Sequence, residues 1–315
     1  MKHDKYMVCT YCTTYNQESY ILDALKGFVS QQTTFPVVSV VVDDASTDKT
    51  VEVIRRFVNN NFDLEDKTIA FEKETDYAQI VFARHKSNIN CFFAILFLKE
   101  NHYRKKPKKP YLKEWMDKAK YIALCEGDDY WTDPLKLQKQ VDFLETHPEH
   151  SLCFHAVNNL YPNGQTKLSS RYKADLEECP IEDFFKIGGA FAPTCSMLYV
   201  NGKLEPTPSF RKKVKVSDSP MILTLFLRGK VGFLRDVMGC YRVNAIGSWS
   251  LRQKQLSYKQ IVDKFWGTLA YWNEINRYTN GKYSKCIRKR KFHTLLSLAK
   301  SLCTLICNMI VAQKK

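Results

Sequence analysis

The sequence predicts an α/β protein with a mostly parallel central sheet flanked by helices and a helical C-terminal extension. Short apolar runs alternate with helical patterns through the first half, which is typical of strand–helix–strand units. Two of these runs end in clusters of acidic residues, and an apolar helical pattern returns near the C-terminus. With 315 residues, 44% of them hydrophobic, the chain is long enough to bury a large core.

The individual elements are predicted from their periodicity. The run at residues 37–42 (VVSVVV) is almost continuously β-branched, as in a central strand covered on both faces. The run at residues 121–125 (YIALC) is a second strong strand, and Pro134 after Asp133 marks the start of the helix that follows it. The full expectation is strands at 7–13, 37–42, 68–71, 121–125, 152–157, 196–200 and 231–234, and helices at 18–30, from 51 to 58, at 90–100, from 137 to 144 and at 219–228.

The net charge of +15 is concentrated in two segments. Residues 102–120 carry eight basic and two acidic side chains, residues 281–315 carry nine basic and no acidic ones, and the rest of the chain is neutral. A nucleic-acid-binding protein usually spreads its positive charge over one face, so we expect no nucleic acid as a partner. Eleven scattered cysteines and an N-terminus without the apolar core of a secretory signal predict free thiols and a cytoplasmic location.

Two acidic clusters directly follow predicted strands. Asp43 and Asp44 come after residues 37–42, and Glu126, Asp128 and Asp129 come after residues 121–125. In an open α/β sheet, ligands bind at the carboxyl ends of the strands. Clustered carboxylates suit Mg²⁺ or Mn²⁺, which often completes its coordination with substrate phosphates. The alternatives are a solvated turn at 43–48 that caps the next helix and an exposed loop at 126–129.

Three stretches resemble a known family. Residues 13–16 (TTYN), residues 40–48 (VVVDDASTD) and residues 121–140 are similar to the family-2 glycosyltransferases, and in particular to bacterial enzymes that build surface polysaccharides. The resemblance is strong over residues 7–144 and weaker to about residue 250. It implies a GT-A fold, a nucleotide-sugar donor, a divalent metal and inversion at the anomeric carbon.

The resemblance also implies roles for residues at the first two strand ends. Thr13 and Tyr15 fall where the family lines the pocket for the nucleotide base. Asp44 falls where a carboxylate accepts a hydrogen bond from the base, a contact that favours uracil and hence a UDP-sugar.

The third stretch carries the implied metal ligands. Asp128 falls at the family's metal ligand, Glu126 replaces the first Asp of the D-x-D motif, and Asp129 is the neighbouring carboxylate. The longer side chain of Glu126 departs from the family pattern, so coordination through water is one expectation there.

Two further residues follow from the order of the family's motifs. Asp218 corresponds to the catalytic base near the start of a helix, with a simple helix N-cap as the alternative. Arg242 is a candidate phosphate ligand, with an ordinary surface arginine as the alternative. Asn244 stands where relatives often have His, which puts one metal or diphosphate contact in doubt.

The two basic segments leave alternatives open. Residues 288–291 (RKRK) precede a helix with many leucines, which suits either peripheral binding to an anionic membrane or ordinary packing on the domain. For residues 104–113 we favour a solvated loop over a site that grips an acidic acceptor.

Taken together, the sequence predicts a GT-A domain at residues 1–250, with a nucleotide-sugar half at about 1–145 and an acceptor half at about 146–250, followed by a basic helical extension at 251–315. The predicted function is transfer of a sugar from a nucleotide-diphosphate sugar to a hydroxyl of a glycan or lipid-linked acceptor, either in the cytoplasm or at the inner face of the cell membrane. The alternatives are a catalytically impaired protein that only binds a nucleotide sugar and, less favoured, a basic nucleic-acid-binding protein.

Overall fold

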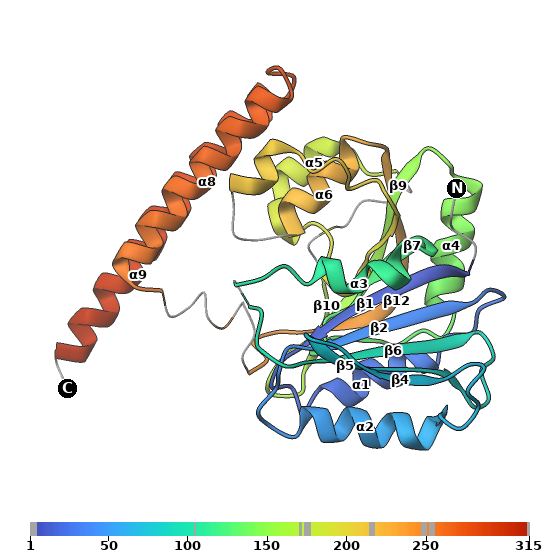
Figure 1. Ribbon diagram of the computed structural model, residues 1–315. Helices are drawn as coiled ribbons and strands as arrows, with labels where there is room; N and C mark the ends of the chain where they lie inside the picture. The colour runs from blue at the N-terminus through green and yellow to red at the C-terminus, as the bar shows by residue number, and fades with distance from the viewer. Residues whose placement is uncertain are drawn as a thin grey trace.

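The computed structural model describes residues 5–103, 105–169, 172, 178–213, 218–246, 251 and 256–313. Within these residues, one sheet runs in the order β3-β5-β6-β2-β1-β7-β11-β9-β12-β8, with β4 beside β5 and β10 beside β9 (Figure 1). The strands are β1 (Tyr6–Thr14), β2 (Val37–Asp43), β3 (Phe62–Asp63), β4 (Phe71–Glu74), β5 (Ala78–His85), β6 (Cys91–Leu98), β7 (Ala119–Leu124), β8 (Tyr130–Trp131), β9 (His150–Leu160), β10 (Thr166–Leu168), β11 (Leu198–Val200) and β12 (Lys230–Arg242).

The centre of the sheet is parallel. Strand β1 pairs in parallel with β2 on one side and with β7 on the other, and β2 pairs in parallel with β6. All seven residues of β2 are buried, as its β-branched sequence predicts for a strand covered on both faces. Antiparallel pairs flank this centre at β5–β6 and β7–β11. The predicted fold class is confirmed.

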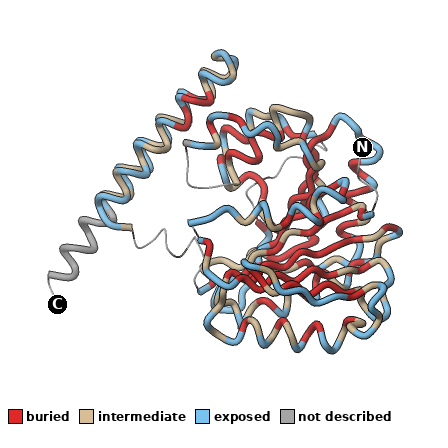
Figure 2. Tube along the Cα trace, viewed as in Figure 1, coloured by how far each residue is buried: buried red, intermediate tan, exposed pale blue. Residues whose placement is uncertain are grey.

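Helices cover both faces of the sheet and form two hydrophobic clusters. On one face lie α1 (Ile21–Val29), α2 (Thr50–Asn61) and α4 (Lys136–Thr146). On the other face lie α3 (Lys109–Met116), α5 (Ile181–Ile187) and α6 (Asp218–Phe226) (Figure 1). Figure 2 shows that the buried residues follow the sheet and the inner sides of these helices.

One predicted helix is wrong. Residues 90–100 form strand β6, which pairs with both β2 and β5 and is buried at seven of its eight positions. An apolar run buried on both faces has no alternating pattern, so its periodicity does not distinguish a strand from a buried helix. The strand predicted at residues 68–71 starts only at Phe71, as the exposed edge strand β4.

The C-terminal region forms a helical hairpin of α8 (Tyr258–Tyr278) and α9 (Ser284–Gln313). The hairpin slants away from the sheet (Figure 1), and much of its surface is exposed or half-exposed (Figure 2). Its turn end packs on the domain, because Trp272, Ile275 and Ile287 belong to the same buried cluster as α5 and α6. In the described part of the chain, no helix is long and apolar enough to cross a membrane.

Candidate active site at the ends of strands β1, β2 and β7

The ends of three adjacent strands bring the two acidic clusters together. The backbone N–H of Asp44 donates to the carbonyl of Thr14 at 2.9 Å, and the N–H of Gly127 donates to the carbonyl of Thr13 at 2.9 Å. The loops after β2 and β7 therefore flank the end of β1 on its two sides. This arrangement follows from the parallel order β2-β1-β7, which places all three carboxyl ends at one edge of the sheet.

The loop after β7 holds three carboxylates with different exposure. Glu126 is exposed, whereas Asp128 and Asp129 are buried. Burial raises the pKa of the Asp128 carboxyl, and the nearby Arg242 guanidinium lowers it again in part. Burial, followed by the charge of Asp128, raises the pKa of Asp129 well above its ordinary range. A cation beside this loop would favour the ionised form of both carboxyls.

Gly127 gives this loop its close contact with the end of β1. A Cβ atom at position 127 would lie 2.5 Å from Gln17 Oε1 and 2.9 Å from the Cβ of Thr14. Thr14 Oγ1 donates to Gln17 Oε1 at 2.9 Å, and the Gln17 side chain also hydrogen-bonds Asp128, where it lowers the pKa of that carboxyl. Only a residue without a side chain leaves room for these contacts.

Arg242, at the end of β12, lies against the same loop. Its backbone N–H donates to Asp129 Oδ1 at 2.8 Å, and its Nη1 donates to the carbonyl of Asp128 at 2.7 Å. Its Nη2 forms an ion pair with Asp23 of α1. The guanidinium also lies 4.7 Å from the ring centroid of Tyr130, a cation–π contact. Arg242 is therefore at the predicted site, with its guanidinium bonded to protein groups.

The segment between β6 and α3 forms hydrogen bonds and an ion pair with Asp44. Its Oδ1 accepts from the backbone N–H of His102 at 2.8 Å, and its Oδ2 pairs with Lys108 Nζ at 2.8 Å. Its carbonyl accepts from Asn101 Nδ2 at 2.9 Å. The expectation of a solvated loop is wrong for Lys108, whose side chain is only 16% exposed. The sequence pattern predicts a helix at β6 and therefore does not indicate that the segment after it lies beside the end of β2.

The loop after β1 is tied to the loop after β2. The backbone N–H of Asn16 donates to Ser46 Oγ at 2.9 Å, and Ser46 N–H donates to Asp43 Oδ2 at 3.0 Å. Asp43 thus shapes the turn, but it is buried, so the alternative interpretation of a solvated turn is wrong at this residue. Thr13 is half-buried at the end of β1, and Tyr15 is 45% exposed in the loop beyond it.

Asp218 lies outside the loops that follow β1, β2 and β7. It is the first residue of α6 and is half-exposed, and the hydroxyl of the next residue, Ser219, lies 3.5 Å from that of Tyr271 in α8. Residues 216–217 of the motif that nominated Asp218, and residues 247–250 of the motif that nominated Arg242, lie outside the described residues. The strand ends thus gather Thr13, Tyr15, Asp44, Glu126, Asp128, Asp129 and Arg242, and Asp218 lies at the start of α6.

The carboxylates at this edge that could hold a divalent cation are those of Glu126, Asp128 and Asp129. The structure arranges no group of three His, Cys, Asp or Glu side chains for a metal among the residues it describes. One oxygen of Asp129 is used by the backbone of Arg242. One or two carboxylates together with substrate phosphates are sufficient for Mg²⁺, so the oxygen donors present fit a cation that binds with its substrate.

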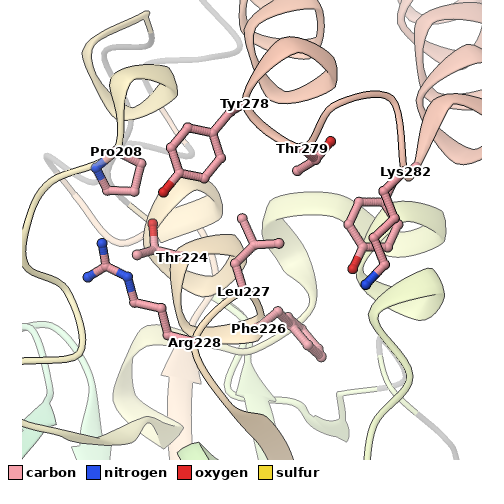
Figure 3. A pocket seen from close by; sticks show the side chains of 9 residues that line it. Pro208, Thr224, Phe226, Leu227, Arg228, Tyr278, Thr279 and Lys282 are labelled. Atoms are coloured by element: carbon pink, nitrogen blue, oxygen red, sulfur yellow. The ribbon is translucent and has the colours of Figure 1, made fainter.

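A separate pocket of about 290 Å³ lies between α6 and the turn of the helical hairpin (Figure 3). None of the predicted site residues lines it. Its lining residues are Pro208, Thr224, Phe226, Leu227, Arg228, Tyr278, Thr279, Lys282 and Tyr283.

Comparison with known proteins identifies similar sequences and folds. The model of the family described as "Glycosyl transferase family 2" matches residues 11–78. "Uncharacterized protein Rv1520" of Mycobacterium tuberculosis and "Uncharacterized protein Mb1547" of Mycobacterium bovis are each 31% identical over 245 residues, covering 75% of this chain and 58% of the relative. This chain therefore spans a little over half the length of these relatives.

Solved structures share the fold over almost the whole chain. S. aureus TarS 1–349 in complex with UDP has a TM-score of 0.55 at 14% identity, covering 94% of this chain and 91% of that one. The mannosyltransferase PcManGT from Pyrobaculum calidifontis, in complex with GDP-Man and Mn²⁺, has a TM-score of 0.54 at 13% identity, covering 98% and 79%.

Proposed function

The chain belongs to glycosyltransferase family 2 and has the GT-A fold, and from this premise we propose that it is an inverting, divalent-metal-dependent enzyme. Its donor is a nucleotide-diphosphate sugar with UDP as the carrier, and its acceptor is a hydroxyl of a glycan or lipid-linked saccharide in surface polysaccharide synthesis. The observation that carries the proposal is the placement of Asp44 and Gly127, which hydrogen-bond to adjacent residues at the end of β1 and thereby bring the two acidic loops together.

In this proposal each half of the domain has its own task. The half at residues 1–145 binds the donor: Thr13 and Tyr15 line the base pocket, and Asp44 accepts a hydrogen bond from N3–H of uracil. Glu126 and Asp128 hold Mg²⁺ or Mn²⁺, with Asp129 behind them and Arg242 near the diphosphate. The chemistry that the cation supplies, when bound, is stabilisation of negative charge on the departing diphosphate.

The half at residues 146–250 positions the acceptor. Asp218 removes the proton from the acceptor hydroxyl as that oxygen attacks the anomeric carbon. A single displacement from the side opposite the diphosphate inverts the configuration at this carbon. Asp218 is half-exposed at the start of α6.

Thermal unfolding in the presence of nucleotide sugars tests this function. A ligand that binds only the native state raises the melting temperature, by an amount set by its concentration relative to Kd. We expect a UDP-sugar to raise it in the presence of Mn²⁺, and we expect Asp128→Asn to remove most of this effect. Asp142→Asn, on the exposed face of α4, is the matched control. If no UDP- or GDP-sugar changes the melting temperature with Mn²⁺ present, the proposed function is wrong.

We also propose that the exposed face of the first turns of α9 contacts an anionic membrane surface from the cytoplasmic side. Phe292 is 60% exposed and Leu296 is 50% exposed, and Arg288 and Lys289 are exposed one turn before them. A cationic helix with exposed apolar side chains binds at a lipid interface through electrostatic attraction to anionic headgroups and burial of the apolar side chains. The division into a GT-A domain at 1–250 and an extension at 251–315 is part of this proposal.

Co-sedimentation with lipid vesicles tests the membrane contact. We expect the protein to pellet with vesicles containing anionic lipid and to remain in solution with zwitterionic ones. The double variant Arg288→Gln/Lys289→Gln should reduce binding several-fold, whereas Lys67→Gln/Lys73→Gln, exposed elsewhere on the domain, should not. Equal binding by both double variants would contradict a role for the hairpin.

A further inference from the structure

The segment that joins β6 to α3 folds over the end of β2 and holds the carboxylate proposed to read the nucleotide base. Strand β6 runs parallel to β2, so the chain leaves β6 at the same edge where Asp44 lies. Asn101 and His102 bond the backbone and one side-chain oxygen of Asp44. The chain then returns, and Lys108 pairs with the other oxygen just before α3 begins. The basic segment is thereby part of the proposed donor site.

The Lys108–Asp44 pair is shielded from water. The side chain of Lys108 is 16% exposed and that of Asp44 is 4% exposed, with 2.8 Å between Nζ and Oδ2. Two neighbouring lysines form ion pairs whose side chains are at least 49% exposed: Lys106 with Glu100 and Lys109 with Glu205. Partial burial makes the pair at Lys108 more rigid than a surface ion pair, which contributes little.

The pair still has hydrogen-bonding capacity for a ligand. An ammonium group has three N–H donors and a carboxylate has about four lone-pair sites, so the contact between them uses one donor and one acceptor. His102 uses a second acceptor site. What remains is an acceptor on Asp44 next to a donor on Lys108.

From this geometry we infer that Lys108 and Asp44 together recognise the nucleotide base, with Lys108 donating a hydrogen bond to it and Asp44 accepting one. An acceptor beside a donor matches a base edge on which an N–H stands beside a carbonyl. Uracil has N3–H between two carbonyls and guanine has N1–H beside O6, so both match. When N3 of the pyrimidine lies opposite Asp44, cytosine presents an acceptor there and makes no hydrogen bond to the carboxylate, and the same holds for adenine N1. A buried polar group left unpaired in this way weakens binding.

This inference rests on the proposed function, and a comparison of UDP with CDP tests it separately. The two nucleotides differ at the base edge: UDP presents N3–H and O4, and CDP presents an acceptor N3 and an amino group. Calorimetric titration with Mn²⁺ present should give the wild-type protein at least a tenfold preference for UDP. Lys108→Met should weaken UDP binding about tenfold and leave CDP binding almost unchanged, so that the preference is lost.

The controls separate base reading from folding and charge. Lys109→Met removes the next lysine, which is exposed and paired with Glu205, and should leave both affinities unchanged. Lys108→Gln keeps a neutral donor at the position and should retain part of the preference for UDP. Unchanged melting temperatures without nucleotide would show that the variants are folded.

Two other outcomes have clear meanings. If Lys108→Met binds UDP as tightly as the wild type or more tightly, Lys108 only occupies the pocket and is displaced by the base, and the inference is overturned. If the wild-type protein binds neither nucleotide with Mn²⁺ present, the proposed function itself fails.

Discussion

Arg242 Nη1 donates a hydrogen bond to the backbone carbonyl of Asp128 at 2.7 Å, so the last residue of β12 holds the acidic loop that follows β7. The backbone N–H of Arg242 binds Asp129 in the same loop. Its ion pair with Asp23 also connects the loop to α1. These contacts make Arg242 a positioning residue for the loop, in addition to the phosphate contact that we propose.

Replacement of Arg242 by Met should weaken Mn²⁺ binding in the presence of UDP by about 10- to 100-fold, which is the usual effect of losing a group that orients metal ligands. Arg242→Lys should recover little, because an ammonium lacks the rigid planar fork with which the guanidinium bonds the Asp128 carbonyl and Asp23 in two fixed directions. Calorimetric titration of Mn²⁺ in the presence of UDP measures the effect. Arg235→Met, exposed on the same strand, is the control, and equal Mn²⁺ affinity in all three variants would contradict the positioning role.

Gly127→Ala tests whether the contact between the acidic loop and β1 matters. The added methyl group would lie 2.5 Å from Gln17 Oε1 and 2.9 Å from the Thr14 Cβ, so Gln17 must move away and its hydrogen bond to Asp128 is lost. We expect a loss of about 1–3 kcal/mol in the free energy of unfolding and at least a tenfold weaker binding of UDP with Mn²⁺. Urea unfolding and calorimetry measure the two effects.

Gly267→Ala provides the matched control for that substitution. Nothing lies within 4 Å of a Cβ at position 267, which is inside α8. Alanine should therefore stabilise the helix by up to about 1 kcal/mol and leave nucleotide binding unchanged. If both variants behave alike, the tight contact at Gly127 has no functional importance.

The sequence predicted those parts of the site that depend on local patterns. The strands β1, β2 and β7 have apolar runs long enough to recognise, and the acidic clusters follow two of them directly, so Asp44 and Asp128 could be placed at one sheet edge. The contacts of Lys108 and Arg242 could not be predicted, because they depend on which strands are neighbours. Lys108 reaches Asp44 only because β6 is a strand beside β2, and Arg242 reaches Asp128 only because β12 brings it beside the loop after β7.

Lys136 should make the stability of the protein depend on pH. It is completely buried with Nζ 3.8 Å from the centroid of the Trp131 ring, and no hydrogen-bond partner for this Nζ is found among the described residues. Burial lowers the pKa of Lys136 from 10.5 to about 7. Between these two values the unfolded chain binds one more proton than the native state, so protonation favours unfolding as the pH falls through this range, and the penalty levels off below pH 7.

Lys136→Met removes this penalty and should stabilise the protein at neutral pH. The gain in the free energy of unfolding should shrink by about 3 kcal/mol between pH 7 and pH 9.5, since each pH unit within the window corresponds to about 1.4 kcal/mol. Urea unfolding of both proteins at the two pH values measures this change. The effect of Met on packing is the same at both pH values, so it cancels in the difference. A gain that is equal at both pH values would show that Lys136 is not neutralised in the native state.

Asp218→Asn tests the assignment of the catalytic base. Asparagine keeps the size of the side chain and can still cap α6, so the free energy of unfolding should change by less than about 1 kcal/mol. It cannot take a proton from the acceptor, so turnover should fall by about 10²- to 10⁴-fold while the Kd for UDP stays the same. UDP release with an acceptor that supports turnover by the wild-type enzyme measures the first effect, and calorimetry measures the second.

The pH profile distinguishes a lost base from a displaced helix. Without the carboxylate, proton removal depends on hydroxide, so the remaining rate of Asp218→Asn should rise with pH across a range where the wild-type rate is flat. A helix that has shifted would lower the rate equally at every pH. Asp183→Asn, in the first turn of the neighbouring helix α5, supplies the comparison for a carboxylate that only stabilises a helix. Turnover of Asp218→Asn near the wild-type level would instead mean that another group takes the proton and that Asp218 serves only to start α6.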